Sequence, residues 1–194
     1  MIKQLFWQTC NILNKYIAQP RMLVGYKSKY SKSYLAQTRI SNTVYIGNPE
    51  KLNIADNVYI GHYCTLECSN GITIAKGCQI STSVLMTTHS SHFAIRLYGR
   101  HYIKNNGHHR GYITGSIAIG AYSFIGAYAT IMPNTKVGKG SIVSAYSYVK
   151  GEFPDFAILA GNPAKIVGDT RELDKELLEQ YPELQEYYNE WANC

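Results

Sequence analysis

The sequence contains 194 residues, with 19 Lys and Arg against 13 Asp and Glu and a formal net charge of +6. This length is enough for one domain with a sizeable hydrophobic core. No apolar run approaches the roughly 20 residues that a membrane span requires. The N-terminal stretch has neither a clean apolar run nor a small-residue cleavage site, so we expect no secretion signal.

Charge is unevenly distributed along the chain. From Asp169 to the C-terminus there are eight acids and two bases, whereas the residues before Asp169 are strongly basic. A basic body of this kind suits an anionic partner, such as a phosphorylated cofactor, an acidic sugar or a membrane surface. The basic residues cluster in a loop and at one end of the chain, without a nucleic-acid-reading motif, so we do not expect nucleic-acid binding.

Residues 1–39 form the first predicted segment, helical and then extended. It contains seven Lys and Arg and no acid. Apolar residues with helical spacing predict a short amphipathic helix near its start; they are Leu5, Phe6, Ile12, Leu13, Tyr16 and Ile17. We expect this helix to pack on the C-terminal helices or on the body of the protein. An alternative is peripheral contact with the inner face of an anionic membrane.

Aliphatic residues recur every six positions from about residue 40. The unbroken set in the second half is Ile119, Ile125, Ile131, Val137, Val143 and Val149. Two earlier sets, separated by a two-residue slip at the sequence SNG, are Ile54, Ile60 and Leu66, then Ile74, Ile80 and Met86. A period of six does not fit an α-helix, in which apolar residues recur at 3.6. It fits a solenoid: a prism-shaped parallel β-helix with three short faces per turn.

The same pattern predicts which side chains fill the prism. Each aliphatic residue should point inward, and so should the slim residue four positions later. These slim residues are Val58, Cys64, Cys78, Val84, Ser123 and Ala129. We therefore interpret Cys64 and Cys78 as core filler rather than metal ligands. The five cysteines, which also include Cys10, Cys68 and Cys194, are odd in number and lack a C-x-x-C pair, which favours reduced thiols in a cytoplasmic protein.

One long excursion interrupts the repeat, and a helical tail follows it. The insertion at residues 90–116 is basic, rich in tyrosine and free of acids. Long excursions inside compact domains are usually functional or disordered, and we interpret this one as a loop that folds over a cleft. The tail at 169–194 predicts helices with a restart at Pro182. The prediction is thus an all-β domain at 40–168 between helical ends.

The repeat, the sequence TTHSSH before the insertion and the closing GNPAK at 161–165 together resemble the hexapeptide-repeat acyltransferases. The resemblance covers about residues 40–168 and is strongest for the maltose and galactoside acetyltransferases and the capsule and O-antigen O-acetyltransferases. It implies a left-handed β-helix, a homotrimer, and acetyl-CoA bound in a groove between neighbouring prisms. The left hand rests on the resemblance alone, because parallel β connections are right-handed in about 98% of cases.

The resemblance also implies which residues act. The family's catalytic histidine maps to His89. A sugar hydroxyl is a poor nucleophile until a base takes its proton, and imidazole suits that task near neutral pH. Candidate acceptor-binding residues are His92, Tyr63, Glu67, Arg96 and Arg110. Glu67 could orient His89 or bind a sugar hydroxyl, but we interpret it as a solvated corner residue.

Cofactor residues map onto the last turns of the predicted prism. Gly126, Ala127, Ser144 and Ala145 resemble the small residues beside the pantetheine arm of CoA. Lys150 and Lys165 resemble the basic residues near its adenosine phosphates. The expected oxyanion donor is a backbone N–H, which the sequence does not identify.

The sequence therefore predicts an acetyl-CoA-dependent O-acetyltransferase acting on a sugar of a bacterial surface polysaccharide or its precursor. Arginines and tyrosines in the insertion suggest an acidic acceptor. Three alternatives stay open: N-acetylation of an amino sugar, a γ-carbonic-anhydrase-like zinc enzyme, and a non-catalytic partner subunit. In the zinc enzyme the candidate ligands would be His62, His89, His92, His108 and His109. Their spacing does not resemble the ligand set of the γ-carbonic anhydrases. We expect no metal.

Overall fold

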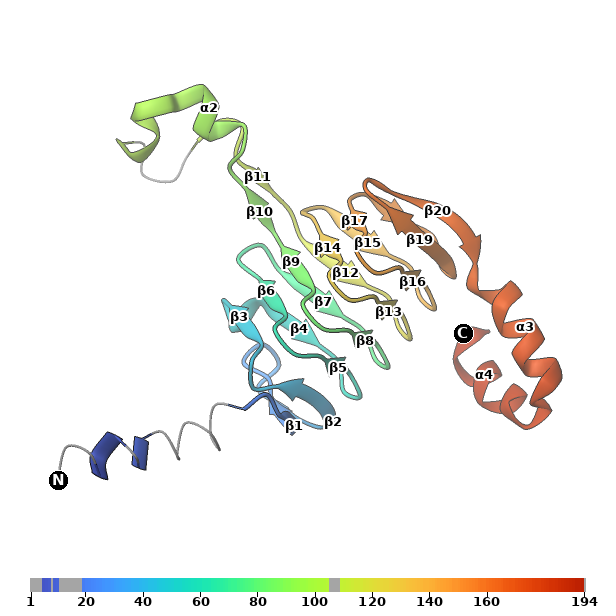
Figure 1. Ribbon diagram of the computed structural model, residues 1–194. Coiled ribbons are helices and arrows are strands. Elements are labelled where there is room, and N and C mark those ends of the chain that lie inside the picture. Colours follow the sequence, from blue (N-terminus) through green and yellow to red (C-terminus); the bar gives the residue numbers. More distant parts are fainter. Residues whose placement is uncertain (1–4, 8, 11–18, 105–108, 194) are drawn as a thin grey trace.

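The computed structural model describes residues 5–7, 9–10, 19–104 and 109–193. Its body is a coil of short parallel strands arranged on three faces (Figure 1). The first face contains β2 (Tyr34–Ser41), β5 (Tyr59–Ile60), β8 (Gln79–Ile80), β13 (Phe124–Ile125), β16 (Ile142–Val143) and β19 (Ala157–Gly161). At the two edges of this face, β1 (Met22–Lys27) and β20 (Ala164–Asp169) pair antiparallel with β2 and β19.

The other two faces contain only parallel strands. The second face contains β3 (Tyr45–Gly47), β6 (Thr65–Glu67), β9 (Leu85–Thr87), β14 (Thr130–Ile131) and β17 (Tyr148–Val149). The third face contains β4 (Leu52–Ile54), which follows the short helix η1 (Pro49–Lys51), and then β7 (Ile72–Ile74), β12 (Ile117–Ile119), β15 (Thr135–Val137) and β18 (Glu152–Phe153). We call the edge between the first and second faces the first corner. The edge between the second and third faces is the second corner, and the edge between the third and first faces is the third corner.

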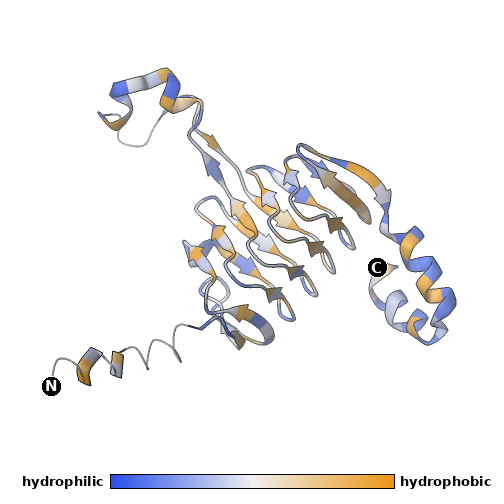
Figure 2. Ribbon diagram, in the orientation of Figure 1, coloured by the Kyte–Doolittle hydropathy of each residue, from blue (hydrophilic) through white to orange (hydrophobic). Residues whose placement is uncertain are grey.

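The six-residue repeat fills the coil as predicted. All six aliphatic residues from Ile119 to Val149 are at most 1% exposed. The predicted slim residues, from Val58 to Ala129, are equally buried. Figure 2 shows apolar residues recurring on strand after strand along the coil. Burying one such aliphatic side chain contributes about 1.5–3 kcal/mol, so the repeat is the main source of the fold's stability.

The length of a turn changes along the coil. Leu66 pairs with Met86, 20 residues later, whereas Ile131 pairs with Val149, 18 residues later. The two extra residues lie in the longer second corner of the early turns, where Gly71 takes the left-handed conformation with φ of +91°. The slip at SNG is therefore a wider corner rather than a break in the coil.

The insertion leaves the coil at the second corner. Its base is the antiparallel pair β10 (His89–Ser90) and β11 (Ile113–Thr114), and its outer part contains α2 (Ala94–Tyr98) and η2 (Gly99–Lys104). We call residues 89–114 the arm. Figure 1 shows the arm projecting away from the coil. The expectation that it folds over a cleft is therefore wrong for a single chain. The coil resumes its register beyond the arm, because β12 pairs directly with β7.

The C-terminal tail contains α3 (Thr170–Gln180), η3 (Pro182–Leu184) and α4 (Gln185–Ala192). The predicted restart at Pro182 is confirmed. Asp169 caps α3 by accepting a hydrogen bond from the Arg171 N–H. Trp191 lies against Tyr122 and Phe156, with ring centroids 4.7 and 5.9 Å apart, so the tail covers the third corner of the last turns.

The described N-terminal residues are helical and then extended, as predicted, but the helical residues do not pack as expected. Residues 5–7 and 9–10 have helical backbone, and Leu5, Phe6 and Trp7 are 60–65% exposed. The other positions of the predicted helix lie outside the described residues. In Figure 1 the helical residues 5–7 and 9–10 lie beyond the β1 end of the coil, whereas α3 and α4 lie beyond the β20 end, so these residues do not pack on the tail. None of the helices in the described ranges is long and apolar enough to cross a membrane.

Candidate active site

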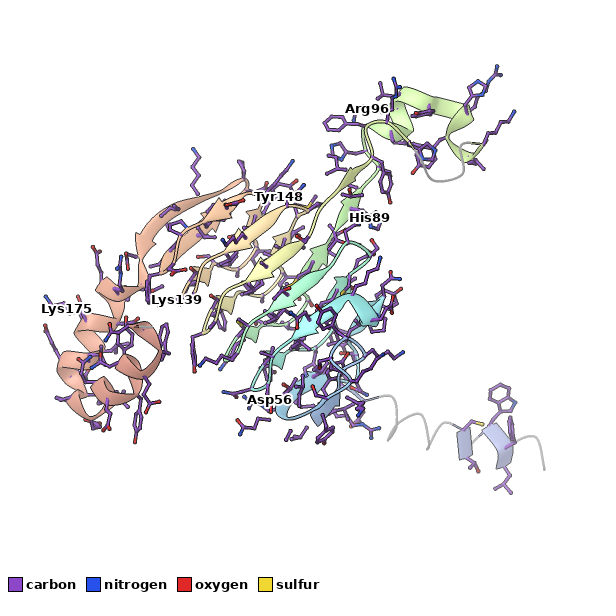
Figure 3. The ribbon with its side chains drawn as sticks, turned by 180° about the vertical axis from the view of Figure 1, so that it is seen from behind. Asp56, His89, Arg96, Lys139, Tyr148 and Lys175 are labelled. Carbon is purple, nitrogen blue, oxygen red and sulfur yellow. The ribbon has the colours of Figure 1, made fainter. Side chains whose placement is uncertain are left out.

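His89 lies at the second corner, where the chain leaves β9 and enters the arm. Figure 3 labels it at the base of the arm, with Arg96 much further out. Its side chain is 35% exposed, so one side of the ring faces the protein and the other faces solvent. Tyr112, on the returning strand of the arm, stacks nearly parallel to the imidazole, with ring centroids 5.6 Å apart. The arm therefore fixes the plane of the His89 ring.

A carboxylate holds the imidazole from the coil side. The Nδ1 atom of His89 lies 2.8 Å from Oε2 of Glu67. A carboxylate accepts but does not donate hydrogen bonds when ionised, so the Nδ1 nitrogen carries the proton and donates it. The Nε2 nitrogen then keeps its lone pair, which is the arrangement a general base needs. The interpretation of Glu67 as a solvated corner residue is therefore wrong, and its contact with His89 agrees with the orienting alternative.

The carboxylate of Glu67 is itself surrounded by donors. Oε1 accepts the Ser69 backbone N–H at 3.0 Å, and Oε2 accepts the Thr88 hydroxyl at 2.8 Å. Burial alone would raise the pKa of Glu67. The hydrogen bonds from Ser69, Thr88 and His89 outweigh burial and lower that pKa to about 2. Glu67 is therefore ionised throughout the physiological pH range and attracts an imidazolium formed beside it.

Two further polar residues brace this cluster. Thr88 is fully buried, and its hydroxyl accepts the Asn70 backbone N–H at 3.0 Å. The Asn70 side chain donates to the Thr88 carbonyl at 3.1 Å and to the Ser69 hydroxyl at 3.0 Å. Because each group is held by at least one partner, the Glu67–His89 pair rests on a rigid corner.

The predicted acceptor residues do not all gather at this site. His92 is exposed at the start of the arm, with Nδ1 2.7 Å from the Ser90 hydroxyl. Arg96 lies over the Phe93 ring at 5.2 Å, and Arg110 is exposed on the returning side of the arm. Tyr63 lies at the first corner, across the second face from His89. Only Glu67 is in contact with His89.

Most of the predicted cofactor residues gather at the first corner. Gly126 and Ala127 follow β13, and Ser144 and Ala145 follow β16 one turn later. A Cβ atom on Gly126 would lie 2.5 Å from the Ala145 nitrogen, so the coil itself requires glycine there. Lys165 lies on β20 opposite Ala160, near the same corner, because the preceding Gly161 N–H donates to the Ser147 hydroxyl at 3.3 Å. Lys150 follows β17 and is exposed at the second corner instead.

Sequence reasoning missed Ser69, Asn70, Thr88 and Tyr112. A usable signal exists for the first three. Since the early turns are 20 residues long, Ser69 lies one turn below His89, and Glu67 pairs in register with Thr87. Tyr112 has no such signal, because its position depends on the antiparallel pairing of the arm. Among the described residues, no three His, Cys, Asp or Glu side chains come together as metal ligands; His108 lies outside them.

The chain matches known transferases in part of its sequence and in its fold. Residues 116–151 match the family of bacterial transferase hexapeptides (six repeats). Serine acetyltransferase 4 of Arabidopsis thaliana is 35% identical over 74 residues, covering 38% of this chain and 21% of that protein. The Bacillus subtilis (strain 168) protein YvoF is 39% identical over 66 residues, covering 34% of this chain and 38% of its own length. The matches thus span less than half of these relatives.

Solved structures show the same fold. The hexapeptide-repeat-containing acetyltransferase VCA0836 from Vibrio cholerae has a TM-score of 0.59 at 22% identity, covering 67% of this chain and 69% of that chain. AntD, an N-acyltransferase from Bacillus cereus in complex with dTDP and 3-hydroxybutyryl-CoA, has a TM-score of 0.57 at 22% identity, covering 74% and 88%. The predicted resemblance to hexapeptide-repeat acyltransferases is confirmed, and it implies a left-handed coil.

Proposed function

We propose that this protein is an acetyl-CoA-dependent O-acetyltransferase that acetylates a sugar hydroxyl in a bacterial surface polysaccharide or its precursor. The observation that carries the proposal is the 2.8 Å contact between Glu67 Oε2 and His89 Nδ1. It leaves Nε2 free to accept a proton at the only corner from which an arm departs in the described chain. The confirmed resemblance to hexapeptide-repeat acyltransferases supplies the reaction class.

The proposed reaction needs no covalent enzyme intermediate. The acceptor hydroxyl oxygen attacks the thioester carbon while Nε2 of His89 takes the hydroxyl proton. The ionised Glu67 stabilises the imidazolium that results. The tetrahedral oxyanion then collapses, the carbon–sulfur bond breaks, and the departing thiolate takes the proton from Nε2. The products are the acetylated sugar and CoA, and the imidazole returns to its starting state.

The positions of the predicted residues support a homotrimer. His89 lies at the second corner, whereas Gly126, Ala127, Ser144 and Ala145 lie near the first corner, with the second face between them. One coil therefore does not bring the proposed base and the proposed donor groove together. In a closed ring of copies, the second corner of one coil faces the first corner of the next, which completes the site.

The arm supplies the proposed acceptor surface. Its cations include Arg96, Arg100 and Arg110, and the whole insertion contains no acid. Guanidinium groups bind carboxylates in a bidentate geometry, so we propose an acidic sugar as the acceptor. A second candidate is N-acylation of a nucleotide-linked amino sugar, which the fold shared with AntD favours.

The test is acetyl transfer measured by release of the CoA thiol, with labelled acetyl-CoA and a panel of acidic, neutral and amino sugars. The variant His89→Ala should remain folded and lose about 10²–10⁴-fold in kcat, the usual contribution of a general base. Near-full turnover by folded His89→Ala would rule out the assigned base. Acetylation of the amino group alone would replace the leading acceptor by the second candidate.

A further inference from the structure

Aromatic residues occupy strained positions at two corners of the coil. Tyr122 and Phe156 at the third corner, and Tyr63, Tyr128 and Tyr146 at the first, all have φ between 57° and 63°. This left-handed conformation is unfavourable for bulky side chains and common for Asn and Gly. A ring kept at such a position indicates that the ring itself is needed there.

The two corners differ in what covers these rings. At the third corner, Trp191 packs on Tyr122 and on Phe156, which is only 7% exposed. At the first corner, Tyr128 and Tyr146 are 52% and 72% exposed. The tail thus covers the aromatic rings of the third corner, whereas no described element covers Tyr128 and Tyr146 at the first corner.

Tyr128 and Tyr146 form an ordered pair. Their ring centroids are 5.0 Å apart and their planes differ by 4°, so the rings stack one turn above the other along the coil. The turn below Tyr128 has the small Ser83 at the equivalent position. The lower face of the stack therefore has no neighbouring ring on the next turn, and a flat ring placed there could extend the stack.

We infer that the Tyr128–Tyr146 pair is a stacking site for the heteroaromatic base of a nucleotide. The inference rests on the proposed function, whose donor groove at this corner brings the adenine of CoA. Its second candidate acceptor, a nucleotide-linked amino sugar, would bring another base to the same place where neighbouring copies meet. Each tyrosine directly follows Ala127 or Ala145, two of the proposed CoA-contacting residues. Lys165 lies on β20, whose turn with β19 is held at Ser147 beside Tyr146, and offers a cation to the phosphates attached to either base.

The test compares ligand affinities by calorimetry, without turnover. The probes are CoA, 4′-phosphopantetheine, which lacks the base, and dTDP. The double variant Tyr128→Asn/Tyr146→Asn should bind a base-containing probe about 10-fold more weakly, because the base loses the aromatic faces on which it stacks. Its affinity for 4′-phosphopantetheine should not change. Loss of CoA affinity identifies adenine as the stacked base, and loss of dTDP affinity alone identifies the base of the acceptor.

Matched variants separate binding from structure. Tyr128→Phe/Tyr146→Phe keeps both rings and should bind as the wild type does. Tyr122→Asn removes a ring from the same backbone conformation under Trp191, so it should lower the unfolding temperature and leave affinity unchanged. The double Asn variant should unfold at the wild-type temperature or above, because asparagine relieves the backbone strain.

Two results would overturn the inference. One is unchanged affinity of the double Asn variant for both CoA and dTDP, when the wild type binds CoA. The other is a weakened oligomer or a fall in unfolding temperature like that of Tyr122→Asn, which would make the pair a structural contact. If the wild type binds neither CoA nor dTDP, the proposed function fails first, and that failure is distinct from either of these results.

Discussion

At the residue scale, Glu67 is the side chain on which the proposed chemistry of His89 depends most closely. It touches no reacting atom, so it is a positioning residue that fixes the tautomer of the imidazole. We expect Glu67→Gln to lower kcat about 10–100-fold with little change in KM, by analogy with carboxylates that orient metal-bound histidines. Steady-state kinetics measures this, with the exposed Glu152→Gln as the matched control. Equal losses in both variants would contradict the assignment.

The lowered pKa of Glu67 also has a consequence for stability. This carboxyl has an ordinary pKa of 4.5 and a pKa of about 2 in the folded protein. Because the folded value is the lower one, ionised Glu67 stabilises the fold above about pH 4.5, and this contribution is lost as pH falls through 2. The difference in free energy of unfolding between wild type and Glu67→Gln should therefore shrink as pH falls from 5 to 2, as denaturant titrations at several pH values can measure.

The buried thiols provide an independent check on the coil. Burial raises the pKa of Cys68 to about 12 and that of Cys78 to about 11. Thiolates are the reactive species, so both side chains should resist alkylation in the native protein at pH 8. Peptide mapping after labelling should find Cys68 and Cys78 modified only after denaturation. Rapid native labelling of either one would show that the coil is not closed around it.

At the scale of elements, the tail acts as a cover for the third corner. Trp191 on α4 contacts the rings of Tyr122 and Phe156, and Thr170 at the start of α3 donates to the Gly140 carbonyl at 2.8 Å. We expect Trp191→Ala to destabilise the protein by about 2 kcal/mol, below the range for a fully buried tryptophan because this one is half-exposed. Denaturant unfolding measures the loss, and the exposed Tyr187→Ala on the same helix is the control.

In a single copy, the outer end of the arm exposes large apolar side chains to solvent. Leu97 and Ile103 are 72% and 90% exposed at its outer end. We expect these exposed apolar residues to pack against a neighbouring copy in the proposed trimer, because burial of apolar surface favours association. Ile103→Asp should therefore shift the protein toward smaller assemblies in sedimentation experiments, and acetyl transfer should fall with it. A variant that stays fully assembled would place Ile103 outside the contact between copies.

At the scale of the whole molecule, the proposed trimer predicts a solution mass three times the chain mass of 21.8 kDa. Mixing provides a sharper measurement. His89→Ala loses the proposed base, and Ala145→Trp fills the proposed donor groove, so each variant alone should be inactive. After joint refolding, some interfaces in hybrid trimers pair the intact His89 of an Ala145→Trp copy with the intact first corner of a His89→Ala copy. Partial activity should therefore return. Complete inactivity of the mixture would mean that base and donor residues act within one chain.

Sequence reasoning predicted the coil better than the site, for a physical reason. The inward positions from Ile119 to Val149 repeat because every turn of the coil has the same environment, and a repeat is visible in one sequence. The contact between Glu67 and His89 depends on the length of a particular turn, which the two-residue slip changes. The β1–β2 hairpin has no six-residue repeat, and the direction of the arm depends on the β10–β11 pairing. Neither leaves a periodic signal.

The pairing of the coil continues past the arm, because β7 and β12 are hydrogen-bonded neighbours although Ile117 follows its partner Ile72 by 45 positions. The corresponding spacing is 20 positions from β4 to β7 and 18 from β12 to β15. An arm attached in this way can be lengthened, shortened or exchanged without changing the strand pairing of the coil. The arm can therefore change to recognise different acceptors, while the coil keeps the proposed donor-binding residues. Such an architecture suits enzymes that use one donor with many acceptors.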